Sequence, residues 1–580
     1  MKKLIKTPIK RVLSLALPHV EWHKAVAIVR ACNLTKVRIA TLTLIYYLGS
    51  TLGALLDGAG LILLVELVAG EFRMTTGAVR NPAVSFLLDL LPIEKGLVPV
   101  YLAALLLFLL RAFVLLFVHV LDGYLQAKTR QVIQKKGITA ILHGDWEYLR
   151  GIRVGQKVGA ITEEALHVAQ FFMAILRTMQ GLLLATVMSL MAISVSIPSA
   201  IIFVLVGIPA SLTLKHLFGQ QSKLSEKLIA ERQGFYASVT ERLSGLFQLK
   251  VEDRLDTHLD HALAFQKRLT GLEIKIWVLR AWVVFSNAVV PALVLLLFYL
   301  ASLLTGEPLK DLLYLLAGVG ALGLRVLGYV NVATGNISSL TSVSGSLGPV
   351  YEVLTIPRQT IKQTIPEKIT GVRTRNLAYS YARRKVLTEV NLDADLASPL
   401  VIKGSSGSGK TTLANLLAGL YEPGEGSVIY LGTSGACYDS REYRPRAGYV
   451  TQDIHLFHDT IRNNLRSTES AVSDDELWEQ LARVGAREFV QRTGGLDVVL
   501  AEGGRSLSGG EKRRIGIARV LVRKPDILIL DEVTSGLDDR IKRELEKTIE
   551  ELSHSIVVVV ITHEPMYIEN HTSFTIPDNT

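Results

Sequence analysis

The sequence is poor in cysteine and in charged residues. Cys32 and Cys437 are the two cysteines among 580 residues, which excludes a disulfide scaffold and a cysteine-rich metal site. Charged residues make up 20% of the chain and hydrophobic residues 49%, with a mean hydropathy of +0.34. Soluble domains carry roughly 25% charged residues, so this composition argues against a purely soluble enzyme. The chain also lacks low-complexity tracts and a glycine triplet repeat, which excludes disordered and collagen-like proteins.

Six long apolar stretches predict membrane-spanning helices. A spanning helix needs about 20 apolar residues, and each stretch is close to that length or longer. A helix also satisfies its own backbone hydrogen bonds in lipid. The stretches are residues 39–70, 97–121, 171–194, 197–214, 276–304 and 312–330.

The segment before the first span is strongly basic. It contains many lysines and arginines and a single acidic residue, Glu21. It has no compact apolar stretch with a small-residue cleavage site, so we do not expect a cleaved signal peptide. Basic residues beside a span favour the cytoplasmic side. We therefore expect a multi-pass protein of the plasma (inner) membrane, with its N-terminus and its C-terminal half in the cytoplasm. The net charge of +10 then reflects membrane topology, and no nucleic acid is expected as a partner.

Two of the connections between spans are long and polar. Residues 126–170 and 215–275 carry apolar side chains at helical spacing, as in Leu243, Leu246 and Phe247. The connections on the other side are short or nearly balanced in charge. We therefore expect spans two to five to continue into the cytoplasm as helices. The alternative is a pair of independent cytoplasmic loops.

Four arginines fall within or at the edge of the predicted spans. A charge near the bilayer centre costs at least about 2.5–3.5 kcal/mol on insertion scales, so each needs a partner or a watery cavity. One interpretation is a basic cavity for an anionic substrate. The alternative is snorkelling near the span ends, or pairing with Asp57 or Glu66. The four are Arg111, Arg177, Arg280 and Arg325.

The composition changes after the last span. Pro357 and Pro366 punctuate a polar stretch, so residues 351–366 are predicted to be a linker. Later apolar runs are short and bounded by turn residues, as in a soluble α/β domain. The predicted fold is a polytopic α-helical membrane domain in residues 1–350, followed by an α/β domain in residues 367–580.

A glycine-rich loop follows the apolar run 400–402 and precedes an apolar helix. It matches the P-loop pattern GxxxxGK[ST] in the strand–loop–helix context that the pattern requires. The glycines let successive backbone N–H groups face phosphate oxygens. Lys410 would reach the β- and γ-phosphates, and the Thr411 hydroxyl would bind Mg²⁺. The predicted nucleotide-binding residues are Gly404, Ser405, Ser406, Gly407, Ser408, Gly409, Lys410, Thr411 and Thr412.

Two apolar strands farther along the chain end in polar residues. The run 527–530 precedes Asp531 and Glu532, and the run 556–561 is followed by Thr562 and His563. Ligands bind at the carboxyl ends of parallel strands, so these residues are expected beside the phosphates. Asp531 would hold Mg²⁺ through water, and Glu532 would act as the general base on the attacking water. His563 would contact the γ-phosphate; a structural role at the strand end is the alternative.

Small residues precede another helical stretch, residues 512–522. The segment Ser508, Gly509, Gly510 and Glu511 therefore predicts a second anion-binding helix N-terminus, with a simple Ser-Gly loop as the alternative.

With these motifs in this order, both halves of the chain resemble exporter-type half-transporters of the ATP-binding cassette (ABC) family. Residues 507–511 are similar to the family signature, which usually ends in Gln where this chain has Glu511. The resemblance implies an ABC ATPase domain in which this loop binds the γ-phosphate of a nucleotide held by the opposite subunit.

The resemblance implies further roles for single residues. Gln452 maps to the Q-loop residue that contacts Mg²⁺. Tyr381 maps to the aromatic side chain that stacks on adenine, with Tyr379 as a rival. Residues 535–538 match the D-loop, with Gly536 in place of the usual Ala, and Glu502 matches an acidic loop that contacts coupling helices.

The same resemblance implies two short coupling helices, near residues 153–159 and 246–254. The chain ends 17 residues after His563, where relatives usually continue. We therefore expect a trimmed C-terminal edge without a regulatory tail.

The resemblance implies an ATP hydrolase coupled to transport, with ATP and Mg²⁺ as cofactors. The catalytic set is complete, which favours a C2 homodimer with two working sites, and a heterodimer is the alternative. The expected function is an ATP-driven exporter or flippase. It would move an amphipathic, lipid-linked, peptide or hydrophobic substrate outward by alternating access.

Other functions are compatible with parts of this pattern. An ATP-gated channel or a regulatory subunit would keep the architecture without pumping. A soluble ATPase bound to nucleic acid would require the apolar runs to be core helices. Within transporters, residues 56–61 and 110–113 weakly resemble flippases for lipid-linked oligosaccharides or exporters of small peptides.

Overall fold

The computed structural model describes most of the chain and divides it into two compact units. The units are Met1–Arg358 and Gln359–Thr580, so the boundary lies within residues 351–366. Helix α14 (Leu347–Leu354) extends into the start of that segment. The described residues are 21–33, 37–73, 97–150, 154–195, 197–253, 255–305, 309–360, 362–381, 384–466, 472–535 and 537–577.

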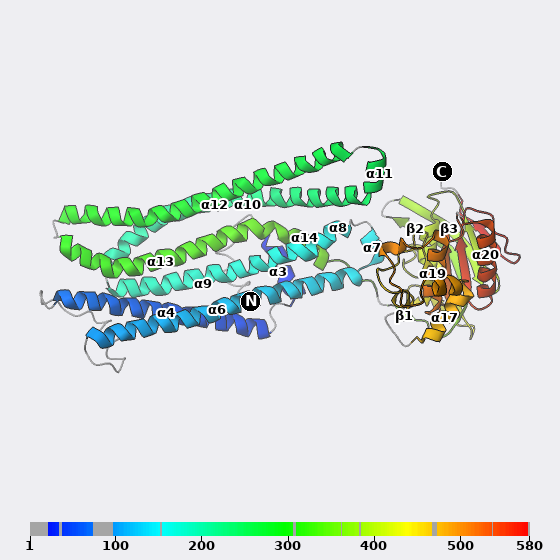
Figure 1. Ribbon diagram of the computed structural model, residues 1–580, viewed down its shortest axis with the longest axis horizontal. Coiled ribbons are helices and arrows are strands. Elements are labelled where there is room, and N and C mark those ends of the chain that lie inside the picture. Colours follow the sequence, from blue (N-terminus) through cyan, green and yellow to red (C-terminus); the bar gives the residue numbers. More distant parts are fainter. Residues whose placement is uncertain are drawn as a thin grey trace. The chain divides into compact units, whose positions relative to one another are not determined.

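Six long helices form most of the described part of the first unit, and each includes one of the predicted spans. They run alongside one another in Figure 1, where α4 packs against α6, α9 against α13, and α10 against α12. Their bounds are α4 (Val37–Arg73), α6 (Leu97–Leu142), α9 (Ala165–Val195), α10 (Ile197–Ser244), α12 (Leu255–Thr305) and α13 (Leu309–Val343).

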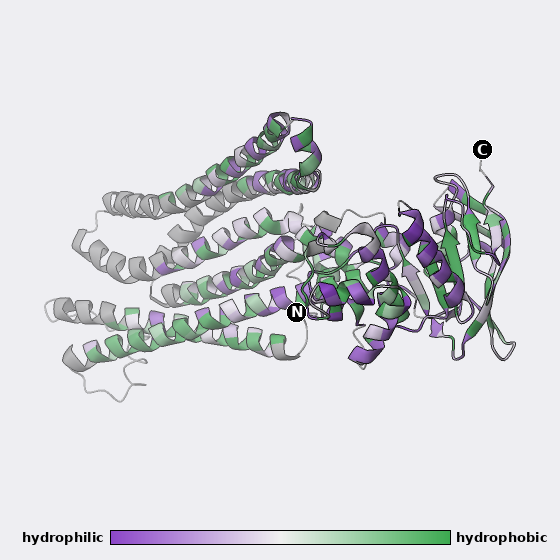
Figure 2. Ribbon diagram, turned by 45° about the vertical axis from the view of Figure 1, so that its right-hand side comes forward, coloured by the Kyte–Doolittle hydropathy of each residue, from purple (hydrophilic) through white to green (hydrophobic). Residues whose placement is uncertain are grey.

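The surface of this unit is apolar along much of its length. Among the described residues, three helices are long and apolar enough to cross a membrane, at Ile39–Leu61, Tyr101–Leu142 and Lys157–Leu190. Helix α6 leaves Leu106 and Phe113 largely exposed, and in Figure 2 the colour of hydrophobic residues covers much of the ribbon of this unit that is not grey. Such a surface is stable against lipid rather than water. The first unit is a helical membrane domain.

The described parts of the polar connections between spans are mostly helical. Helix α10 runs 30 residues past the predicted span end at residue 214, and α12 begins 21 residues before the predicted span start at residue 276. The predicted helical extension is therefore confirmed, and independent loops are excluded in these segments.

Short helices occupy the turns between these extensions. They are α7 (Trp146–Arg150), α8 (Val154–Gly159) with the π-helical turn η1 (Ala160–Glu164), and α11 (Leu246–Val251). Helices α8 and α11 lie where the coupling helices are predicted, while Arg153 and Arg254 lie outside the described residues. A further helix, α3 (Trp22–Ala31), packs on α14.

Parallel strands form the central sheet of the second unit. Its order is β11-β4-β10-β9-β8, and every neighbouring pair is parallel. The central strands are fully buried, as expected for a sheet covered on both faces. The bounds are β4 (Leu400–Lys403), β8 (Ala447–Val450), β9 (Ile527–Asp531), β10 (Val557–Ile561) and β11 (Thr572–Thr575).

A second, antiparallel sheet has the order β3-β2-β5-β6. Its strands are β2 (Ile369–Tyr381), β3 (Arg384–Asp395), β5 (Glu425–Gly432) and β6 (Cys437–Asp439). A small sheet pairs β1 (Gln363–Thr364) with β7 (Tyr443–Arg444). One apolar core joins the two larger sheets around α15 (Lys410–Leu417).

A second apolar core lies under the remaining helices of this unit. The helices are α16 (Ile461–Leu465), α17 (Asp474–Arg483), α18 (Arg487–Arg492), α19 (Gly509–Leu521) and α20 (Asp539–Ser553). The two cores hold the central sheet rigidly, so that the loops at its carboxyl edge are supported from both sides. The second unit is an α/β P-loop domain.

Candidate functional site

The register of the central sheet brings the predicted catalytic residues to one edge. Ile561 on β10 lies opposite Asp531 on β9 and opposite Ile402 on β4. All three strands are parallel, so their carboxyl ends meet there. Glu532 follows β9 directly, and His563 follows β10 by two residues. The P-loop follows β4 at the same edge.

The P-loop depends on glycines with positive φ. Gly407 and Gly409 have φ of 84° and 104°, which other residues rarely adopt. A Cβ on Gly409 would also lie 2.9 Å from the Val386 side chain. Gly409 is followed directly by α15, whose N-terminus provides backbone N–H groups and a positive dipole end. The loop therefore has the geometry of a phosphate cradle.

Lys410 is buried within this loop. Its Nζ donates hydrogen bonds to the carbonyl oxygens of Gly404 at 2.9 Å and Ser405 at 2.8 Å. Burial lowers the pKa of Lys410, while the charges of Glu532 and Asp531 act in the opposite direction. The lysine therefore shares one electrostatic environment with both carboxylates.

Glu532 contacts two other predicted site residues. Gln452 donates from Nε2 to its carboxylate at 2.6 Å, and His563 Nε2 lies 3.2 Å from the other carboxylate oxygen. The Glu532 backbone N–H donates to Ile561 O at 2.9 Å, which continues the β9–β10 ladder. These contacts bring the Q-loop residue, the acid and the histidine together.

Asp531 lies beside Glu532 and accepts a hydrogen bond from the Tyr449 hydroxyl at 3.2 Å. Burial raises the pKa of Asp531, and the Tyr449 hydrogen bond opposes that shift. A cation beside Asp531 would favour its ionised form. The other predicted metal ligands, the Thr411 hydroxyl and the Gln452 amide, offer oxygen atoms of the kind that Mg²⁺ prefers. The residues present therefore fit the predicted metal.

The two candidate adenine-binding tyrosines have different environments. Tyr379 is 4% exposed and stacks on Tyr421, with ring centroids 5.4 Å apart and planes 7° from parallel. Tyr381 is half-buried at the end of β2, and its hydroxyl lies 3.2 Å from Thr412 Oγ1. The ring of Tyr381 is thus beside the P-loop helix, whereas the ring of Tyr379 is part of the core.

The predicted signature loop forms a capping box at the start of α19. Ser508 Oγ accepts from the Glu511 N–H at 3.3 Å, and the Glu511 carboxylate accepts from the Ser508 N–H at 2.9 Å. Either Glu or Gln can close this motif, so Glu511 preserves the local geometry. Gly509 is exposed, and a Cβ added to it would meet open space. Gly536 and the side chain of Glu502 lie outside the described residues.

The four arginines of the membrane domain divide into two pairs. Arg111 and Arg325 both lie 3.2 Å from the fully buried carboxylate of Asp57. Arg177 and Arg280 line a cavity of about 600 Å³ between the helices. The structure therefore does not bring all four into one basic site.

Several neighbours of these residues were not predicted from the sequence. They include Tyr449 beside Asp531, Asp122 beside Arg177, and Trp277 beside Arg280. Trp277 could have been found, because residues three apart on a helix share one face. The Asp122–Arg177 pair joins two helices, and no spacing within the sequence indicates such a pair.

Comparison with known proteins agrees with this architecture. Residues 387–535 match the family model described as ABC transporter. A solved bacterial Atm1-family ABC exporter with ATP bound has the same fold, with a TM-score of 0.75, 18% identity, and 94% of each chain covered. The second unit is an ABC transporter ATPase domain. Fused to the helical membrane domain, it gives the chain the architecture of an exporter-type half-transporter.

Curated relatives match over part of their length. A glutathione/L-cysteine transport system ATP-binding/permease protein of Haemophilus influenzae is 34% identical over 216 residues, which is 37% of this chain and 38% of that protein. An ATP-dependent lipid A-core flippase of Desulfotalea psychrophila is 37% identical over 201 residues, covering 34% of this chain and 35% of the relative. The matched region thus spans less than half of each relative.

Proposed function

We propose that this protein is an ATP-driven exporter or flippase that moves an amphipathic substrate outward across the plasma (inner) membrane. The main support for this proposal is the edge of the central sheet, where Glu532 contacts both Gln452 and His563. Fused to a helical membrane domain, such a site couples nucleotide turnover to movement of helices. In this proposal the membrane domain (residues 1–350) moves the substrate and the ATPase domain (residues 367–580) hydrolyses ATP. A linker (residues 351–366) joins the two domains.

The working unit in this proposal is a homodimer. Ser508 and Gly509 are exposed, so they are available to a nucleotide held by a second copy. Each composite site would combine Lys410 and Glu532 of one copy with Ser508 of the other. ATP would stabilise the closed pair of ATPase domains, and hydrolysis would release it. The short helices α8 and α11 would transmit closure to the membrane domain.

Within each site, the residues have separate tasks. The P-loop and Lys410 bind the phosphates, Tyr381 stacks on the adenine, and Glu532 takes a proton from the attacking water. His563 and Gln452 hold the Glu532 carboxylate in place. Mg²⁺, held by Thr411, Gln452 and (through water) Asp531, would neutralise charge on the phosphates when bound.

The names of the relatives point to two kinds of substrate, a lipid A-core in one case and glutathione or L-cysteine in the other. Both are amphipathic or polar molecules with charged groups.

An ATP-gated channel would use the same nucleotide site. Recordings in planar bilayers separate a channel from a pump, because a pump passes no macroscopic current.

Glu532→Gln tests this function. The variant should bind ATP but hydrolyse it about 10²–10⁴-fold more slowly, because the general base is lost while the phosphate cradle is intact. ATP binding and phosphate release are measured on the full chain in lipid nanodiscs. Glu551→Gln, exposed on α20, is the matched control and should hydrolyse normally. Rapid turnover by Glu532→Gln would contradict the assigned role.

A further inference from the structure

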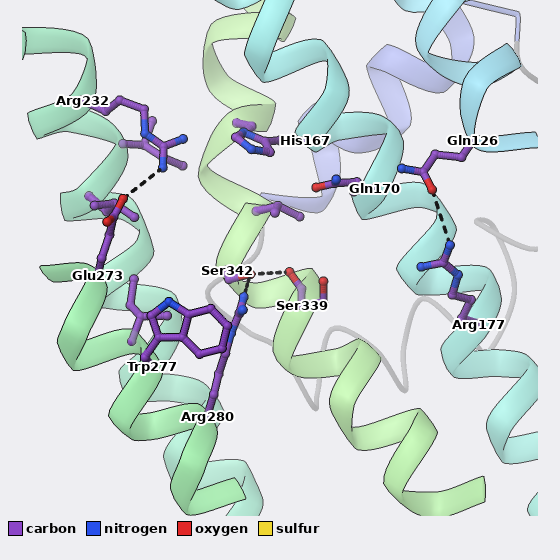
Figure 3. A pocket seen from close by; sticks show the side chains of 15 residues that line it. Gln126, His167, Gln170, Arg177, Arg232, Glu273, Trp277, Arg280, Ser339 and Ser342 are labelled. Atoms are coloured by element: carbon purple, nitrogen blue, oxygen red, sulfur yellow. Dashed lines mark hydrogen bonds and ion pairs between the residues drawn. The ribbon is translucent and has the colours of Figure 1, made fainter. Parts of the chain in front are cut away.

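The membrane domain contains a cavity of about 600 Å³ that lies within one chain. This volume is within the range of about 300–1,000 Å³ found for small-molecule sites. Figure 3 shows its polar side chains converging from α6, α9, α12 and α13, with Arg232 entering from α10. The apolar part of the wall includes Trp277, Ile276 and Leu228.

Two of the three arginines in this cavity are neutralised by carboxylates. Arg177 Nε lies 3.1 Å from Asp122 Oδ1. Arg232 lies 3.4 Å from Glu163 and 4.0 Å from Glu273. Their charges are compensated before any ligand arrives.

Arg280 has a different environment. Its Nη2 donates to Ser342 Oγ at 2.7 Å, and its guanidinium carbon lies 5.2 Å from the centroid of the Trp277 ring. Within the described part of the chain it makes no ion pair, and its buried Nε has no hydrogen-bond acceptor. A guanidinium has five donors in a planar fork that matches carboxylates and phosphates. Among the described residues that line the cavity, Arg280 is therefore the one arginine without a carboxylate partner, and it keeps N–H groups that can donate to a ligand.

The surroundings of Arg280 are both apolar and polar. Trp277 offers a flat apolar surface next to the charge (Figure 3). Gln170 and Ser339 line the cavity from α9 and α13 and can hydrogen-bond to uncharged polar groups. A ligand that satisfies all of these groups carries an anionic group next to an apolar segment.

We propose that this cavity binds the transported substrate through a single anionic group, a carboxylate or a phosphate, which pairs with Arg280 while an adjoining apolar segment packs on Trp277. The proposal rests on the transport function proposed above and names the substrate class. The anion belongs either to a soluble acylated acid or to the headgroup of an anionic lipid.

The test compares an acid with its neutral ester. The full chain is placed in phosphatidylcholine nanodiscs without nucleotide, and binding of N-decanoylglycine and of its methyl ester is measured by calorimetry. We expect the acid to bind at least about tenfold more tightly, because the charge-assisted hydrogen bonds to Arg280 need the carboxylate. Equal binding of acid and ester to the unaltered protein would overturn the proposal.

Variants on α12 locate the effect. Arg280→Gln should lose the preference for the acid, and Arg280→Lys should keep part of it. Arg268→Gln is the matched control, because Arg268 is exposed on the same helix and pairs with Glu231. A preference for the acid that survives in Arg280→Gln would overturn the assignment to this cavity.

Two further measurements separate the outcomes. Displacement of N-decanoylglycine by nanodiscs containing phosphatidylglycerol would identify a lipid headgroup as the source, and no displacement would identify a soluble acid. Both results support the anionic class. ATP hydrolysis in the same nanodiscs tests the proposed function separately: hydrolysis without a preference for the acid refutes only the cavity chemistry, and a preference without hydrolysis refutes only the pump.

Discussion

Glu532 has a φ of 48°, a left-handed backbone conformation that is uncommon for residues other than glycine. Such strain persists only where surrounding contacts hold it, and it clusters at active sites. Here the contacts are the backbone hydrogen bond to Ile561 and the side-chain contacts to Gln452 and His563. The strained turn directs the carboxylate toward the edge where the P-loop lies.

Motifs could predict the identity of these residues but not their contacts. The strand-end rule placed Asp531, Glu532 and His563 at one edge, and the register agrees. No local pattern predicts that Lys410 donates to carbonyl groups of its own loop, because that contact depends on the loop's conformation. The packing of Tyr379 and Tyr381 also depends on Tyr421, which contacts both rings and is 40 residues away from the nearer of them.

Glu511 closes the capping box at the start of α19. Glu511→Gln should leave the free energy of unfolding unchanged because Gln also closes the capping box. Glu511→Ala should lower the free energy of unfolding by about 0.3–1.5 kcal/mol. Denaturation of the purified protein measures both. Equal destabilisation by the two substitutions would show that the charge, and not the hydrogen bond, stabilises the start of α19.

At the scale of elements, a buried carboxylate joins three helices of the membrane domain. Asp57 on α4 is fully buried and lies 3.2 Å from both Arg111 on α6 and Arg325 on α13. Hydropathy predicted the positions of these helices in the sequence, because a long apolar stretch is a local property of the chain. Pairing with Asp57 was one of several open alternatives for the arginines, since the rotation of a helix about its axis is not fixed by its own sequence.

Asp57→Asn should destabilise the membrane domain strongly. It leaves two arginines without a counter-charge, and breaking a buried ion pair costs about 3–5 kcal/mol. Arg325→Gln should cost less, because Arg111 still neutralises Asp57. Thermal unfolding of both variants in detergent measures the difference. A smaller effect of Asp57→Asn than of Arg325→Gln would show that Asp57 does not join the helices.

At the scale of the whole molecule, the chain combines a membrane domain with a single ATPase domain. The predicted fold class and the ABC resemblance are confirmed. Both could be predicted because the composition changes between the two units and the motifs of the second unit occur in a fixed order. The substrate site was less predictable. Of the four arginines singled out, two line the cavity, and the cavity wall is assembled from helices that are distant in sequence.

Two inactive variants that complement each other test whether one nucleotide is shared by two copies of the chain. One copy carries Lys410→Ala and the other Gly509→Arg, which adds bulk where a Cβ meets open space. The two copies are co-expressed with different tags, and mixed dimers are isolated by two successive purifications. Each mixed dimer has one intact composite site, formed by Lys410 of one copy and Ser508 of the other. Mixed dimers should hydrolyse ATP while neither variant does so alone. Mixed dimers as inactive as the separate variants would show that the nucleotide site is not shared between two copies.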